Sequence, residues 1–276
     1  MKYLVYGPGY SESSGGIIVL HKLCSMLTEI GEDSDYFVMN QVNQNVSYDP
    51  DKDVVIYPEV IKGNPLGFKR IVRWALNHGS HNLKNFKKDN LVFYYSKFFR
   101  DYIFDMDCNE LIKSQNNDVN NILQVLVPNE SKFIDYGAKR KGSVFMCHKA
   151  IEKGYNIGLP EKDSIQIRNN MNMNSLVKIF NSVERFYTYD TVTYYSVIAV
   201  LCGATSIVIP EKNLTKDEWR NKVWGMKYGI AYGVDDIEYA EETKSLVRSH
   251  IIELGKSSID SVRNFIKVSK NYWQYA

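Results

Sequence analysis

Long apolar runs, a secretion signal and an excess of either charge are missing from this 276-residue chain. The longest apolar stretch, Ser196–Ile209, is too short to span a bilayer and is broken by Gly203. The opening residues, MKYLVYGPGY, lack the apolar core and small-residue cleavage site of a signal peptide. A formal net charge of +2 favours neither a nucleic acid nor an anionic membrane as partner. We therefore expect a cytoplasmic protein with no transmembrane segment.

Paired cysteines are also absent. The four cysteines (Cys24, Cys108, Cys147 and Cys202) form no Cys-x-x-Cys pair, and no histidine stands near them at metal-binding spacing. Three of them lie in apolar segments, where a buried free thiol is the usual state. We expect no metal and no cofactor. What the chain does have is 44% hydrophobic and 24% charged residues, the balance of a packed globular protein.

The first half of the chain alternates strands with longer connections. Tyr3–Tyr6 is a strand that ends at a glycine turn, and the apolar spacing from Gly15 to Ile30 predicts a helix that ends at Gly31. Further strands are predicted at 35–39, 53–57, 91–95 and 122–127. Such a pattern is typical of a mostly parallel, doubly wound α/β sheet.

The pattern begins again after a polar, basic stretch at 136–143, which we interpret as a linker. The second half has predicted strands at 143–147, 185–189 and 205–209, with helices at 174–183, 191–201, after Thr215-x-x-Glu218, and from about residue 235 onward. The sequence thus predicts two Rossmann-like domains, 1–136 and 137–258. A ligand is expected in the cleft between them, just after the strands.

The first glycine turn is the first candidate site. A dinucleotide fingerprint needs a third glycine where Glu12 stands and an acid after the second strand, which ends in Met39-Asn40. A nicotinamide-dependent enzyme is therefore disfavoured. Gly15 and Gly16 still suit the close approach of a phosphate to a helix N-terminus, although a simple loop before a helix explains them equally well.

The stretch from Phe186 to Glu211 carries more information. Asp190 follows a strand and is expected to cap the next helix. The first turn of that helix would then offer hydroxyl and backbone N–H groups to a diphosphate. The candidate donor-binding residues here are Tyr187, Tyr189, Thr191, Thr193, Tyr194 and Ser196.

This stretch resembles the donor-binding region of GT-B glycosyltransferases, which follows the pattern Y-S-Y-D-x-x-T-x-x-S-x-x-A-x-x-C-G-C-x-x-x-V. The matching residues are Tyr187, Tyr189, Asp190, Thr193, Ser196, Ala199, Cys202, Gly203 and Val208. Ser14-Gly15-Gly16 and the segment 53–66 resemble other parts of the same enzymes. The resemblance implies transfer of a sugar from a nucleotide-diphosphate sugar to a glycan, lipid-linked or other hydroxyl acceptor. It also implies metal independence and a role in bacterial or viral polysaccharide synthesis.

The resemblance further implies roles for particular residues. Lys149 and Lys153 would bind the donor diphosphate, and Glu59 and Asp190 are the acids expected to act in catalysis. A C-terminal helix, 259–276, would cross back to the first domain through an apolar stripe that includes Ile259, Val262, Phe265, Ile266 and Tyr272. Separately, His78 follows a predicted helix and is a candidate catalytic or acceptor-side group.

Two alternatives stay open. Many retaining relatives carry an acid for the donor ribose eight positions after the first acid, where this chain has Ile198. A non-catalytic nucleotide- or carbohydrate-binding module would explain that loss. A metal-dependent GT-A transferase would instead use an Asp-x-Asp motif, for which the candidates are Asp49/Asp51, Asp51/Asp53 and Asp105/Asp107.

Overall fold

The computed structural model describes residues 1–12, 14–77, 86–87, 90–105, 121–126, 130–152, 154, 157–168, 171–223 and 225–274. The chain divides into two compact units. The first comprises Met1–Val127 together with Gly255–Ala276, and the second comprises Pro128–Leu254. The predicted boundaries, 136/137 and 258/259, lie nine and four residues beyond those of the two units (136 − 127 and 258 − 254).

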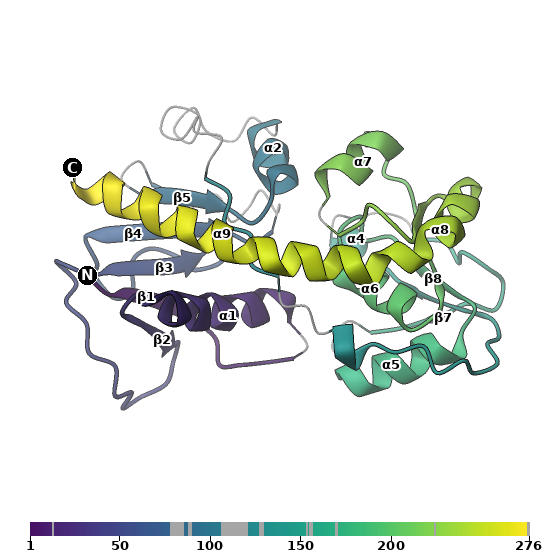
Figure 1. Ribbon diagram of the computed structural model, residues 1–276, viewed down its shortest axis with the longest axis horizontal. Helices are drawn as coiled ribbons and strands as arrows, with labels where there is room; N and C mark the ends of the chain where they lie inside the picture. The colour runs from purple at the N-terminus through teal and green to yellow at the C-terminus, as the bar shows by residue number, and fades with distance from the viewer. Residues whose placement is uncertain are drawn as a thin grey trace. The chain divides into compact units, whose positions relative to one another are not determined.

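The first unit is built on a five-stranded sheet in the order β2-β1-β3-β4-β5, and every neighbouring pair is parallel (Figure 1). Ser14 caps the first helix by accepting a hydrogen bond from the Ile17 amide, and Gly31 ends it in the left-handed conformation at φ 98°. The elements are β1 (Tyr3–Gly7), α1 (Gly15–Ile30), β2 (Ser34–Val38), β3 (Val54–Pro58), β4 (Arg70–Ala75), β5 (Leu91–Tyr94) and α2 (Lys97–Asp105).

Strand β4 escaped the sequence analysis because Arg73 interrupts its apolar run. The Arg73 side chain is only 1% exposed and lies over the Tyr57 ring, 4.9 Å from its centroid. Its guanidinium donates to the carbonyl oxygens of Ile61 and Gly63 and to Asn90 Oδ1. Buried charge is tolerated when its donors are paired in this way. Arg73 therefore fixes the loop that follows β3.

The prediction of a strand at 122–127 is wrong for residues 122–126, the part of that range that the structure describes. Residues 121–126 make one parallel bridge, between Ile122 and Tyr94, and no longer ladder. The backbone N–H of Gln124 donates instead to Ser261 Oγ, and that of Leu126 donates to Ser258 Oγ. Serine hydroxyls of a helix thus take the place of a neighbouring strand.

The second unit repeats the architecture, with a parallel sheet in the order β10-β9-β8-β6-β7. The predicted capping box is confirmed, since Thr215 and Glu218 bond reciprocally at the start of α7. The elements are η2 (Glu130–Lys132), β6 (Ser143–Met146), α4 (His148–Glu152), β7 (Ile165–Gln166), α5 (Met173–Ser182), β8 (Arg185–Thr188), α6 (Tyr194–Leu201), β9 (Thr205–Val208), α7 (Lys216–Lys222), β10 (Ile230–Tyr232), η3 (Val234–Asp236), α8 (Ile237–Thr243), η4 (Lys244–Leu246) and α9 (Val247–Gln274).

Helix α9 is a single 28-residue helix that belongs to both units (Figure 1). Its first two turns bury Val247 and Ile251 in the second unit. In the first unit, Phe265 is fully buried, and its ring centroid lies 5.5 Å from that of Tyr3 and 4.9 Å from that of Phe93. The structure therefore packs the C-terminal part of α9 against β1 and β5.

The apolar stripe predicted for this helix is partly wrong. Val262, Phe265 and Ile266 are buried, but Ile259 is 42% and Tyr272 is 38% exposed. Two serines complete the buried face: Ser258 is 1% exposed, and Ser269 is fully buried with its hydroxyl 2.8 Å from the Tyr3 hydroxyl. Apolar spacing misses such positions, because a small hydroxyl side chain is buried readily once it has a hydrogen-bond partner.

Candidate functional site

The strand orders place a topological switch point in each unit. In the first sheet, β2 and β3 lie on opposite sides of β1, and in the second, β7 and β8 lie on opposite sides of β6. Connections leave the sheet in opposite directions at such points, which opens a crevice at the carboxyl ends of the strands. The candidate positions are therefore the residues after β1 and β3 and those after β6 and β8.

The turn after β1 has a defined aromatic support. A side chain at Gly7 would place its Cβ 2.5 Å from the Tyr36 hydroxyl, so a larger residue there would have to displace the Tyr36 side chain. Tyr36 donates to the Pro8 carbonyl oxygen over 2.8 Å, and its ring stacks on that of His21 with the ring centroids 3.7 Å apart. His21 Nε2 also lies 3.3 Å from the Pro8 oxygen. These contacts give His21 a structural role.

Gly15 and Gly16 open helix α1, as predicted. A Cβ added at Gly15 would meet nothing within 4 Å, and one at Gly16 would make ordinary contact with Leu76 Cδ1 at 3.8 Å. Neither glycine is required by the local backbone, since neither has a positive φ. A small side chain could therefore be accommodated at either position.

Glu59 follows β3 at the switch point of the first unit. It is 4% exposed, and its Oε2 accepts a hydrogen bond from the Leu76 amide over 2.9 Å. Burial raises the pKa of Glu59 from 4.5 to about 7, although the hydrogen bonds from the Leu76 and Glu59 amides oppose this rise. The side chain of Leu76 would be in ordinary contact with a Cβ at Gly16, so the residue whose amide binds Glu59 neighbours the start of α1. A carboxyl group with such a pKa can accept a proton near neutral pH.

Asp190 follows β8 at the switch point of the second unit and is 3% exposed. Its predicted role as the cap of α6 is wrong. The N-cap of that helix is Thr193, whose side chain accepts from the Tyr195 amide. Asp190 Oδ1 accepts instead from the amide of Ala150, in the first turn of α4, over 3.1 Å. Asp190 therefore links β8 to the helix that follows β6.

Tyr187 and Tyr189 face the loop that follows α4. The Tyr187 hydroxyl donates to Glu161 Oε1 and the Tyr189 hydroxyl to the Gly158 carbonyl oxygen, each over 2.7 Å. Burial, and then the bond to Glu161, raise the pKa of Tyr187 to about 12. Burial raises the pKa of Glu161, but hydrogen bonds from Ser143, Tyr187 and Arg185 outweigh this and hold its pKa below the ordinary value. Both tyrosine hydroxyls therefore bind the loop 158–161.

Thr191 binds Glu211, an acid that was not predicted as a site residue from the sequence. Its hydroxyl donates to Glu211 Oε2 over 2.7 Å, just after β9, and its carbonyl oxygen accepts from the Trp219 indole. The amide of Glu211 donates to the Tyr232 hydroxyl, whose ring stacks on Trp219 with the centroids 4.9 Å apart. Glu211 stands directly after the predicted strand 205–209, so its position after a strand was the available signal.

The other predicted donor-site residues divide into two groups. Thr193 and Tyr194 start α6 and are half-buried, next to Thr191. Ser196 is fully buried in the interior of α6, which removes it from the surface that a ligand can reach. The backbone of Lys149 lies in α4, but its side chain is outside what the structure describes. Lys153 and His78 lie outside the described residues.

The described Asp-x-Asp candidates stabilise turns, because the carboxylates of Asp49 and Asp53 accept hydrogen bonds from backbone amides. Asp49 Oδ1 accepts from the Asp51 amide, and Asp53 accepts from the amides of Lys2 and Asp49. The side chain of Asp105 and all of Asp107 lie outside the described residues. Within the described part of the chain, no group of three or more His, Cys, Asp or Glu side chains is arranged to hold a metal ion. Nor does any helix in that part have the length and apolar character to cross a membrane.

Comparison with solved structures gives a full-length match. The structure of T4 phage BGT in complex with UDP and Mn²⁺ aligns with a TM-score of 0.51 at 11% sequence identity, and the alignment covers 98% of this chain and 99% of that one. BGT is a β-glucosyltransferase of the GT-B type. The chain has the GT-B fold. No protein-family model and no curated protein matches it.

The GT-B fold confirms the predicted class of two Rossmann-like domains. The burial of Ile198 shows that an acid would not fit at this position of the chain. Ile198 is fully buried in α6, as are its neighbours Val197 and Ala199. A carboxylate at this position would be buried among apolar side chains at a high energetic cost. In this version of the GT-B fold, the position belongs to the core.

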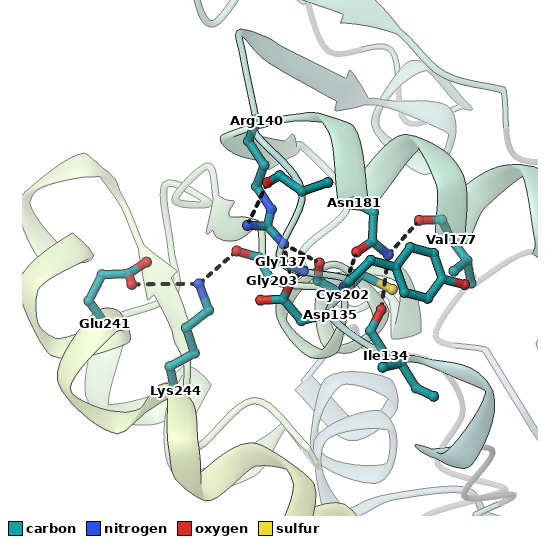
Figure 2. Close-up of polar contacts among 12 residues, drawn as sticks. Ile134, Asp135, Gly137, Arg140, Val177, Asn181, Cys202, Gly203, Glu241 and Lys244 are labelled. Carbon is teal, nitrogen blue, oxygen red and sulfur yellow. Dashed lines mark hydrogen bonds and ion pairs between the residues drawn. The ribbon is translucent and has the colours of Figure 1, made fainter.

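Cys202 and Gly203 also have a structural explanation in this GT-B chain (Figure 2). Arg140 Nη2 donates to the Cys202 carbonyl oxygen over 3.1 Å, and Lys244 Nζ donates to that of Gly203 over 2.9 Å. Two cations thus bind the carbonyl oxygens at the C-terminal end of α6, where the helix dipole favours positive charge. Gly203 has φ 95°, and a Cβ there would overlap with Arg140 Nη2 and Asp135 Oδ2.

The stretch predicted as a linker is therefore anchored at its start (Figure 2). Arg140 pairs with Asp135, whose Oδ1 also accepts from the Gly137 amide over 2.8 Å. Asn181 accepts from the Tyr136 amide and donates to the Ile134 carbonyl oxygen. These contacts attach residues 134–140 to the ends of α5 and α6.

Proposed function

We propose that this chain is a glycosyltransferase that moves a sugar from a nucleotide-diphosphate sugar to a hydroxyl acceptor. The observation that carries the proposal is the full-length likeness to a GT-B protein whose solved structure contains UDP. The acids and hydroxyls at both switch points support it, because ligands of open α/β sheets bind there.

In this proposal the first unit binds the acceptor and Glu59 is the general base. A hydroxyl becomes a competent nucleophile when a base removes its proton as the new bond forms. With a pKa of about 7, Glu59 is partly ionised at neutral pH and still basic enough to take the proton. The rate should then rise as Glu59 loses its proton, through the region around pH 7.

The second unit binds the donor in this proposal. As the sugar leaves, negative charge develops on the diphosphate, and fixed donors and cations lower the energy of that state. We assign this task to Lys149, Lys153 and the hydroxyl of Thr193, because the Thr191 hydroxyl already donates to Glu211. We further propose that the reaction needs no metal ion. The Mn²⁺ in the BGT complex makes this a point for experiment.

A donor screen tests the function. Purified protein is incubated with UDP-, GDP- and dTDP-sugars, with EDTA or with Mn²⁺, and both the thermal transition and the release of free nucleoside diphosphate are measured. We expect one donor class to raise Tm and to be turned over equally well with EDTA. Turnover that requires Mn²⁺ would refute metal independence alone. Failure of every donor to bind would refute the proposed function.

A non-catalytic module is the second candidate, and the buried Ile198 is the observation that favours it. Such a module would bind a nucleotide sugar and raise Tm without turnover against any acceptor. The GT-A alternative requires a different fold and is set aside.

A further inference from the structure

Strand β8 is connected to both ends of the segment that joins β6 to β7. At the beginning of that segment, Asp190 Oδ1 accepts from the Ala150 amide over 3.1 Å, inside α4. The backbone of Asp190 is itself fixed, because its amide donates to Thr188 Oγ1 over 3.0 Å and its carbonyl oxygen accepts from the same hydroxyl. The carboxylate is 3% exposed. It is therefore held against α4.

The end of the segment between β6 and β7 is held by side chains of β8 and of the residue that follows it. Side chains at alternate positions of a strand point to one face, so Arg185, Tyr187 and Tyr189 share a face. Arg185 and Tyr187 both donate to Glu161 Oε1 over 2.7 Å, and Tyr189 donates to the Gly158 carbonyl oxygen over 2.7 Å. Two side chains of β8 and that of Tyr189, directly after it, thus determine where the loop 158–161 lies.

We propose that Asp190 and Tyr189 are positioning residues, which hold α4 and its following loop in place for the donor diphosphate. This rests on the proposed function, because Lys149 directly precedes Ala150 in the sequence and Lys153 stands between the two anchored points. Asp190 acts as a hydrogen-bond acceptor for α4, and neither its charge nor proton transfer is required of it. This differs from the catalytic role that its position after a strand suggested.

Substitutions at Asp190 separate the two roles. Asp190→Asn keeps an oxygen that can accept from the Ala150 amide but removes the charge, whereas Asp190→Ala removes both. For a positioning residue, the asparagine variant should behave like wild type, and the alanine variant should bind the donor more weakly with little change in kcat. For a catalytic acid, both variants should fail alike.

The experiment measures donor KM, kcat and amide hydrogen exchange in the full chain. A buried amide that loses its acceptor weakens the arrangement by roughly tenfold in an equilibrium constant. We expect Asp190→Ala to raise the donor KM about tenfold. Tyr189→Phe, which removes an exposed hydrogen bond to Gly158, should raise it less, by about threefold. In both variants kcat should stay within about threefold of wild type. The amides of residues 150–152 and of Gly158, Leu159 and Glu161 should exchange faster in these variants. Asp190→Asn should stay within about threefold in both constants. Tyr136→Phe, at a tyrosine that is 61% exposed, is the matched control and should change nothing.

Two outcomes would overturn the inference. The first is an Asp190→Asn enzyme as inactive as Asp190→Ala with its hydrogen exchange unchanged, which would make the charge essential. The second is a Tyr189→Phe enzyme identical to wild type in KM and in exchange. Failure of the proposed function itself would look different, because the wild-type protein would then bind no nucleotide sugar. The exchange measurement stays informative even in that case.

Discussion

Replacing Glu59 with glutamine should make the protein more stable at alkaline pH while abolishing transfer. Glutamine matches the shape of the glutamate side chain, and its carbonyl oxygen can still accept from the Leu76 amide. It differs in carrying no charge, so the comparison isolates the cost of ionising a carboxyl group that is 4% exposed.

The sign and the magnitude follow from linkage. Between pH 4.5 and about 7 the folded protein keeps the Glu59 proton while the unfolded chain has lost it, so the free energy of unfolding falls as pH rises. Below pH 4.5 both states are protonated and the group contributes nothing. Above about pH 7 the full cost applies, which at about 1.4 kcal/mol per pKa unit is about 3 kcal/mol.

Urea unfolding of wild type and Glu59→Gln, followed by circular dichroism at pH 5 and at pH 8, tests this reasoning. We expect the two proteins to be nearly equal at pH 5 and the variant to be more stable by about 3 kcal/mol at pH 8. If the difference in unfolding free energy between the two proteins is the same at both pH values, ionisation of Glu59 does not destabilise the fold. A variant less stable at pH 8 would contradict the argument outright.

Three further outcomes are expected. Gly203→Ala should lower the free energy of unfolding by about 1–2 kcal/mol, because φ is 95° there and a Cβ would overlap with Arg140 and Asp135; Gly15→Ala, where a Cβ meets nothing, is its control in the same urea titration. Phe265→Ala should cost about 3–5 kcal/mol by leaving a cavity beside Tyr3 and Phe93, whereas Ile259→Ala, at a position 42% exposed, should cost little. Transfer by the wild-type enzyme should increase with pH through about pH 7 as Glu59 ionises, and a flat pH–rate profile would speak against Glu59 as the base.

The sequence was sufficient for the fold class because the apolar strands and helix caps follow simple periodicities. Gly31, Ser14 and the Thr215 capping box behave as their local patterns predict. The errors lie where tertiary contacts replace those patterns. Arg73 can be buried in a strand because its guanidinium lies over the Tyr57 ring and donates to carbonyl oxygens of the loop that follows β3. Residues 122–126 form no ladder, because two serines of a helix distant in sequence accept from the amides of Gln124 and Leu126.

The candidate site was predictable in its position and not in its contacts. A position directly after a strand pointed to Asp190, and the resemblance to GT-B glycosyltransferases pointed to Glu59; both residues lie at switch points. Nothing local to Asp190 indicates that it caps α4 instead of α6, because Ala150 is 40 residues away in sequence. Glu211 was missed for a similar reason: its partner, Thr191, follows a different strand.

Acceptor-dependent release of nucleoside diphosphate is the most direct test of the proposed transfer. Wild type and Glu59→Gln are incubated with the donor that binds best and with a panel of hydroxyl acceptors, and both free diphosphate and the glycosylated acceptor are quantified by mass spectrometry. The account predicts acceptor-dependent turnover by wild type, and loss of at least about 100-fold in the variant, which corresponds to removal of a general base. Donor binding should be unchanged. Equal turnover by the two proteins, or donor binding with no transfer to any acceptor by wild type, would contradict it.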